Sequence, residues 1–161
     1  MEIKLDENDF IVSKTDLAGK ITYGNKMFIK MSGYSEKELL SSPHNILRHE
    51  DMPKVVFKLL WDRIQNKDSI YAYVKNLTKN GQYYWVFASA TASVDENDNV
   101  VGYYSVRRKP HDKAIGVVQG LYEKLLQVEK SEGIDGSEKY LNHLLEEKGI
   151  GYDEFILSIQ K

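Results

Sequence analysis

Alternating apolar and polar residues predict five short strands, two early in the chain and three later. The expected strands cover residues 10–14, 20–23, 70–77, 82–94 and 100–107. Asn80-Gly81 is a strong signal for a tight hairpin turn between the third and fourth strands. Because helical segments interrupt the strands as one block, the order favours an α+β fold, an antiparallel sheet with helices on one face.

Capping residues predict two short helices after the second strand. Asn25 is suited to cap the first helix, which Gly33 ends. Ser35 and Glu38 have the spacing of a capping box at the start of the second helix.

A longer helix is expected after Pro53, with Asp51 as its N-terminal cap. Its apolar residues recur at helical spacing, and Trp61 lies on a neighbouring stripe. A polar loop that leads into so apolar a helix would suit one wall of a ligand pocket.

Beyond Pro110 the spacing changes to that of an amphipathic helix over residues 111–130. Residues 131–136 are predicted to be a linker, followed by a helical pair at 137–148 and 153–160. We therefore divide the chain into a first domain, residues 1–110, and a C-terminal helical extension, residues 111–161. The apolar stripe of the extension suits packing on its own domain or contact with a partner.

Composition narrows the function classes. The 161 residues carry a formal charge of −2, which gives no reason to expect nucleic acid as a partner. The absence of cysteine excludes disulfides and thiolate chemistry and suits a reducing cytoplasm. The acidic N-terminus lacks the apolar core of a secretory signal, and no segment is apolar enough for direct membrane insertion.

The loop between Pro43 and Pro53 gathers His44, Arg48, His49 and Asp51 with few residues to bury. Taken alone, such a loop is more often solvated than functional. A metal site is the weaker interpretation, because the two histidines lack i, i+4 spacing and no cysteine assists them.

The predicted sheet offers further polar and small residues on its inner face. Asn76 ends an apolar row, and a buried amide needs a partner, either the following turn or a ligand. Tyr84 shares a face with Ala88 and Ala90, and the alanines leave space that a ligand or a helix must fill.

Four pieces of the sequence, in order and spacing, are similar to PAS domains of the aerotaxis and energy-taxis family. They are ITYGNKMFIKMSGYSEKELL, PHNILRHEDMP, VKNLTKNGQYYWV and GYYSVRRKP, within residues 15–110. The resemblance implies the PAS fold, a five-stranded antiparallel sheet with helices around a cofactor cavity. It also implies non-covalent binding of FAD, whose redox state such domains report. The resemblance implicates Asn25, Arg48, His49, Asp51 and Asn76 in cofactor binding. His44, Trp61 and Tyr84 are our further candidates for the same site.

One position departs from the family pattern. Ile70 stands where the family usually carries a tryptophan, and the neighbouring Tyr71 is expected to point to the opposite face of the strand. The cavity contents therefore stay open between FAD, haem b and none. For haem, His44 and His49 are the candidate ligands.

The resemblance implies a redox sensor for energy taxis, not an enzyme. Its partner would be the cytoplasmic region of a membrane-bound methyl-accepting chemoreceptor, which would recruit this cytoplasmic protein to the inner face of the membrane. A homodimer through the PAS domain or the C-terminal helices is a further possibility. The competing interpretation is a cofactor-free PAS module for protein–protein interaction.

Overall fold

Five antiparallel strands form a single sheet in the order β2-β1-β5-β4-β3. The computed structural model describes residues 1–160. The strands are β1 (Ile11–Thr15), β2 (Ile21–Gly24), β3 (Ile70–Leu77), β4 (Tyr83–Val94) and β5 (Val100–Arg108). Each predicted strand is present within one residue of its expected ends, and the predicted fold class is confirmed.

The helices between β2 and β3 follow the local capping signals. They are α1 (Lys26–Ser32), α2 (Glu36–Leu39), the 3-10 helix η1 (His44–Leu47) and α3 (Lys54–Gln65). Asn25 caps α1 by accepting from the Phe28 amide, and Gly33 ends it with a φ of 77°. Ser35 and Glu38 complete the predicted capping box of α2.

The prediction that Asp51 caps α3 is wrong. Pro53 occupies the cap position and provides no side-chain hydrogen bond. The Asp51 carboxylate instead accepts a hydrogen bond from the Lys75 ammonium at 2.7 Å. The Lys54 amide in the first turn of α3 donates to the Glu129 carboxylate at 2.8 Å, so this helix is capped from the C-terminal extension.

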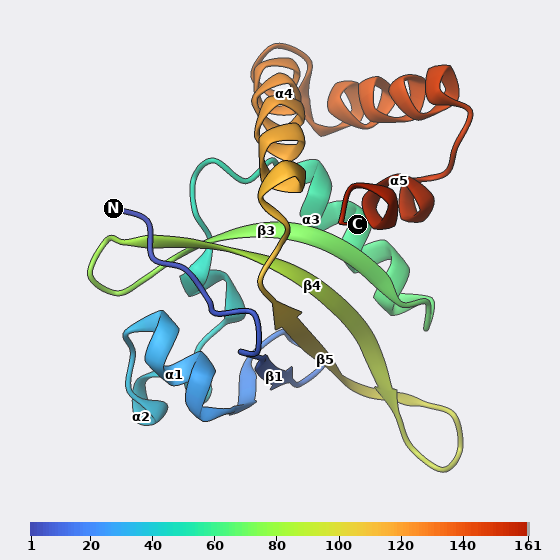
Figure 1. The fold of residues 1–161 in the computed structure, drawn as a ribbon. Coiled ribbons are helices and arrows are strands. Elements are labelled where there is room, and N and C mark those ends of the chain that lie inside the picture. Colours follow the sequence, from blue (N-terminus) through green and yellow to red (C-terminus); the bar gives the residue numbers. More distant parts are fainter. Residues whose placement is uncertain (161) are drawn as a thin grey trace.

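The extension consists of α4 (Asp112–Lys148) and α5 (Tyr152–Ile159). The predicted linker at 131–136 is wrong, because helix continues on both sides of Gly133. Gly133 alone adopts a non-helical conformation with a φ of 75°, which glycine reaches without steric cost. α4 therefore bends sharply at this residue, as Figure 1 shows.

The extension and the early helices lie on opposite sides of the sheet (Figure 1). α1 and α2 lie on the inner side, and α4 and α5 cover the outer face of β3 and β4. Tyr73, Trp85 and Phe87 of that outer face share one buried core with Val118 and Leu125 of α4. The apolar stripe of the extension therefore packs on the chain's own domain, and it closes the outer face of β3 and β4 to a partner.

Candidate functional site

A cavity of about 220 Å³ lies between the inner face of the sheet, η1 and α3. α3 contributes Phe57, Leu60, Trp61 and Ile64, whose spacing of three and four residues places them on one helical face. The sheet contributes Ala88 and Ala90 among others, so the alanine row does leave the space that its small side chains predict. Apolar side chains thus line most of the cavity.

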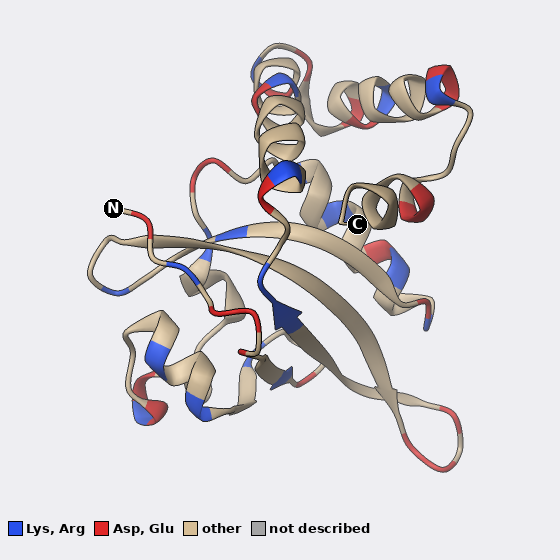
Figure 2. Ribbon diagram, in the orientation of Figure 1, with Lys and Arg blue, Asp and Glu red and all other residues tan. Residues whose placement is uncertain are grey.

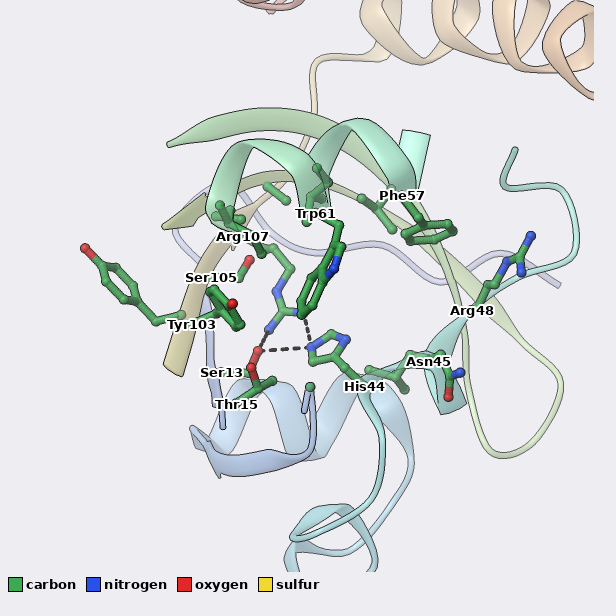
Figure 3. Close-up of a pocket in the computed structure, with 18 of the residues that line it drawn as sticks. Ser13, Thr15, His44, Asn45, Arg48, Phe57, Trp61, Tyr103, Ser105 and Arg107 are labelled. Atoms are coloured by element: carbon green, nitrogen blue, oxygen red, sulfur yellow. Dashed lines mark hydrogen bonds between the residues drawn. The ribbon is translucent and has the colours of Figure 1, made fainter. Parts of the chain in front are cut away.

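A polar cluster closes the inner end of this cavity, where β1, β5 and η1 meet (Figure 3). Arg107 of β5 donates through one terminal nitrogen to Nε2 of His44 at 3.2 Å and through the other to the Ser13 hydroxyl. The same His44 nitrogen lies 3.1 Å from the Ser13 hydroxyl. Register explains the meeting, because Ser13 pairs with Ser105 and Arg107 lies on the same face of β5.

The hydrogen bonds determine which groups in this cluster are charged. Arginine only donates, so Nε2 of His44 must accept and the imidazole must be neutral. Burial of the ring, with the nearby guanidinium as a second cause, lowers the pKa of His44 to about 3. Burial lowers the pKa of Arg107 to about 10, which leaves the guanidinium charged at neutral pH.

Arg107 is a buried cation without an acidic partner. Only 3% of the residue is exposed, and no carboxylate within residues 1–160 forms a salt bridge with it. Its Nε atom has no hydrogen-bond partner among the described residues. The Phe28 ring lies 4.9 Å from the guanidinium, a weaker compensation than an anion would give. A buried charge of this kind favours a ligand that brings negative charge or hydrogen-bond acceptors.

Asn76 and Tyr84 add two further unsatisfied polar groups on neighbouring strands. The Asn76 amide nitrogen and the Tyr84 hydroxyl are buried and have no hydrogen-bond partner in the described part of the chain. Asn76 lines the cavity, and its side chain also lies beside the Tyr84 hydroxyl, whose pKa it helps to lower. Tyr84 does not line the cavity, although its hydroxyl is close enough to Arg107 for that cation to offset part of the pKa rise that burial causes.

Arg48 and Trp61 lie at more exposed positions of the cavity wall. The Arg48 guanidinium donates to the Met52 carbonyl at 3.1 Å and lies 5.3 Å from the Phe57 ring centroid. Trp61 makes an edge contact with Tyr103, with ring centroids 5.2 Å apart. Both side chains carry surface-exposed atoms, so they are placed to contact parts of a ligand that reach toward solvent.

Besides Tyr84, three of the predicted site residues lie outside this cavity. Asn25 caps α1 and donates its amide to the Phe10 carbonyl at 2.9 Å. His49 accepts from the Asp51 amide at 3.0 Å and packs edge-on against Tyr83. Asp51 pairs with Lys75 on the outer face. Each of these three residues therefore makes contacts that hold its own segment of the chain in place.

Ile70 and Tyr71 lie as the strand alternation predicts. Ile70 is buried and packs with Ile64, Ala90 and Tyr103, three residues that line the cavity. Tyr71 points to the other face and stacks on Phe87 at 5.7 Å. Aromatic surface at this end of the cavity therefore comes from Trp61 and Tyr103.

Sequence reasoning missed Arg107 and Ser13, the centre of the polar cluster. Arg107 belongs to the run Arg107-Arg108-Lys109, which has the composition of a solvated strand end. Strand alternation could have separated the two arginines, because it places Arg107 beside Ser105 on the inner face and Arg108 on the outer face.

Comparison with known families agrees with this architecture. The family model described as the PAS fold matches residues 21–107, more than half of the chain. The chain belongs to the PAS family. Within residues 1–160, no helix is both long enough and apolar enough to span a membrane.

Within that family, the chain is a PAS protein of the aerotaxis group. It is 40% identical over 121 residues to the aerotaxis receptor of Escherichia coli (strain K12). The aligned region covers 75% of this chain and 24% of that receptor. The chain is 22% identical over 104 residues to the nitrogen fixation regulatory protein of Klebsiella pneumoniae. That aligned region covers 65% of this chain and 21% of the regulatory protein. The chain thus spans no more than about a quarter of these curated relatives.

Solved structures show the same fold. A light-oxygen-voltage domain studied with a flavin analogue superposes with a TM-score of 0.62 at 19% identity, covering 71% of this chain and 87% of that one. The PAS domain of a protein from Colwellia psychrerythraea superposes with a TM-score of 0.57 at 23% identity, covering 62% of this chain and 85% of that one.

Proposed function

We propose that this PAS domain binds FAD non-covalently in the cavity and reports the redox state of the flavin to a chemoreceptor signalling partner. The observation that carries the proposal is Arg107, a buried cation at the end of an apolar cavity with no acidic partner among the described residues. The sequence resemblance to the energy-taxis family, which binds FAD, points to the same ligand.

The residues present fit the polar and apolar parts of a flavin. Its ring system is aromatic and flat, which suits the apolar walls from α3 and the alanine row. Its pyrimidine edge carries carbonyl and imide groups, which complement the Arg107 guanidinium and the unpartnered Asn76 amide. When bound, a flavin accepts and returns electrons, and its charge and hydrogen-bonding groups change with its redox state.

The size of the cavity bears on how much of FAD it holds. A volume of about 220 Å³ is below the roughly 300 Å³ that marks the lower end of small-molecule sites. We infer that the ring system enters the cavity and that the remainder of the molecule extends toward solvent. Arg48 and Trp61 are the residues placed to hold that part, through charge and stacking respectively.

Haem is the weaker candidate for the same cavity. Nε2 of His44 already accepts from Arg107, and the adjacent guanidinium opposes a cationic iron centre. His49 does not line the cavity, and its Nδ1 accepts from the Asp51 amide. The hydrogen bonds at His44 Nε2 and His49 Nδ1 therefore favour flavin over haem.

For the partner, we propose the cytoplasmic region of a membrane-bound methyl-accepting chemoreceptor, which would bring this protein to the inner face of the membrane. The similarity to a protein named aerotaxis receptor supports a role in the same behaviour. A sensor of this kind responds through conformational change, so no catalytic residues are assigned.

The visible spectrum of freshly purified protein tests the cofactor. We expect two broad bands in the blue and near ultraviolet, released as FAD on denaturation. A single intense, sharp band would indicate haem. Colourless protein that takes up no added FAD under native conditions would overturn the proposal and leave the interaction module as the better interpretation.

A further inference from the structure

A second hollow, separate from the cavity, lies where α3, the second half of α4 and α5 meet. This groove has a volume of about 610 Å³. Its floor is apolar, formed by Val55 and Leu59 of α3 and by Leu141 and Leu145 of α4. An apolar floor of this kind suits side chains inserted by another molecule, as in helix-in-groove recognition.

The rim of the groove is acidic. It carries the carboxylates of Asp62, Glu138, Glu146 and Glu154. Among residues 1–160, the one cation that also lines it, Arg63, pairs with Asp153 at 2.9 Å. Lys58 bridges two of these carboxylates, at 3.0 Å from Asp62 and 2.8 Å from Glu138. Figure 2 shows the acidic segment at the start of α5.

Two rim carboxylates have no cationic partner in the described part of the chain. Glu146 and Glu154 are exposed and form no salt bridge within residues 1–160. The groove therefore combines an apolar floor with an excess of negative charge. Charge complementarity selects a cationic partner, because like charges placed at such a rim repel.

We propose that this groove binds a basic amphipathic segment of a partner protein. Apolar side chains of that segment would occupy the floor, and its lysines or arginines would pair with Glu146 and Glu154. A small apolar ligand would gain nothing from the acidic rim, and an acidic segment would be repelled by it.

The same helix forms a wall of both the groove and the cavity. Val55, Leu59 and Asp62 of α3 face the groove, whereas Leu60 and Ile64 line the cavity. A partner in the groove would thus contact the helix that a cavity ligand also contacts. Only this link to signalling rests on the proposed function, because binding in the groove needs no cofactor.

Fluorescence anisotropy on the full chain without cofactor tests the groove. The probe is a short synthetic labelled peptide with leucines on one helical face and lysines on the other. We expect it to bind the wild type, with affinity at least about tenfold lower for the double variant Glu146→Lys/Glu154→Lys. Glu147→Lys/Glu123→Lys is the matched control, because it makes the same charge change at exposed positions outside the groove and should bind like the wild type.

Several results would overturn the proposal. Equal weakening in both charge-reversed variants would indicate general attraction, and unchanged binding in Glu146→Lys/Glu154→Lys would exclude the rim. Equal binding of a peptide with glutamates in place of lysines would contradict the charge argument.

If sedimentation showed a wild-type dimer that only the groove variant dissociates, the occupant would be a second copy of this chain. Glu146→Gln/Glu154→Gln and circular dichroism separate lost binding from lost folding, and failure here would leave the FAD proposal standing.

Discussion

Arg107 donates a hydrogen bond to Nε2 of His44 at 3.2 Å, and this contact keeps the imidazole neutral beside a permanent cation. Neither residue can neutralise the other. The inner end of the cavity therefore retains one positive charge, which is matched only when a ligand supplies acceptors or negative charge.

Replacing Arg107 by Met should separate binding from stability. Loss of a charge-assisted hydrogen bond costs about 1.5–3 kcal/mol, which corresponds to a roughly ten- to hundredfold weaker affinity for FAD. The cofactor-free variant should be at least as stable as the wild type, because an unpaired buried charge is removed. Titration with FAD and thermal unfolding measure the two effects.

Arg108→Met is the control for that substitution. Arg108 is the next residue on β5 but is exposed, with its guanidinium 5.6 Å from the Phe10 ring centroid. We expect unchanged affinity for FAD. If both variants lost the same affinity, net charge rather than the cavity would be the cause.

The folded protein should become less stable as the pH is lowered, because His44 is buried in its neutral form. Its pKa is about 3 in the folded protein and about 6.5 when unfolded, so below pH 6.5 the unfolded chain binds a proton that the folded chain does not. The stabilisation is complete above pH 6.5 and is lost as pH falls toward 3. At pH 5 the loss is on the order of 2 kcal/mol, from 1.5 pH units at about 1.36 kcal/mol each.

Denaturant unfolding of the cofactor-free protein at pH 7 and pH 5 measures this term. His44→Gln keeps an acceptor for Arg107 but does not titrate, so its stability should change less between the two pH values. His143→Gln, at an exposed residue 3.0 Å from Glu147, should behave like the wild type. Identical pH dependence in His44→Gln and wild type would contradict the assignment.

Arg48→Ala should purify folded but with less flavin. Arg48 is exposed, so we expect a smaller loss of affinity than at Arg107, roughly tenfold at most. Arg48→Lys should restore only part of it, because an ammonium cannot reproduce the planar guanidinium. Lys54→Ala, at an exposed lysine outside the cavity, is the control. Unchanged cofactor occupancy in Arg48→Ala would remove this residue from the site.

The extension should contribute to the stability of the whole chain. Leu125 of α4 is fully buried in the core that includes Tyr73 and Trp85, so Leu125→Ala should cost about 2–5 kcal/mol. Val117→Ala, on the exposed side of the same helix, should change stability by roughly 0.5 kcal/mol or less. Chemical unfolding followed by tryptophan fluorescence compares them. An equal, small effect would mean that the extension packs loosely on the sheet.

Removing the carboxylate that caps α3 should weaken the link between the extension and the cavity wall. Glu129→Ala should lower stability by about 0.5–2 kcal/mol, the usual effect of losing an N-terminal cap. Glu123→Ala, at an exposed residue of the same helix, should have little effect. Hydrogen exchange should report faster exchange of the Lys54 amide in Glu129→Ala alone, and protection that stays at wild-type level would exclude the capping role.

Signals that act over a few residues were predictable. Asn25, Gly33 and Ser35 each act on backbone groups within four residues, so their types and spacing suffice to place α1 and α2. Asp51 shows the limit of this reasoning. Its side chain satisfies the local rule for a cap, yet it binds Lys75, a residue 24 positions away that no local pattern reveals.

The candidate site was predictable only in part. The alanine row and Asn76 follow from strand alternation, and both line the cavity. The polar cluster depends on register between β1 and β5, which brings Ser13 to within hydrogen-bond distance of a residue 94 positions later. Gly133 shows a different limit of sequence-based prediction. Residues 131–136 have the composition of a linker, yet helix continues through them and only Gly133 departs from helical geometry.

The hydrogen bond from Lys54 to Glu129 joins residues 75 positions apart. It has a consequence for the order in which the protein is made. Chains emerge from the ribosome at roughly 5–20 residues per second and begin to fold from the N-terminal side. All five strands, which end at Arg108, therefore emerge before the residue that caps α3. During synthesis there is therefore an interval in which all five strands have emerged and the first turn of α3 still lacks its cap.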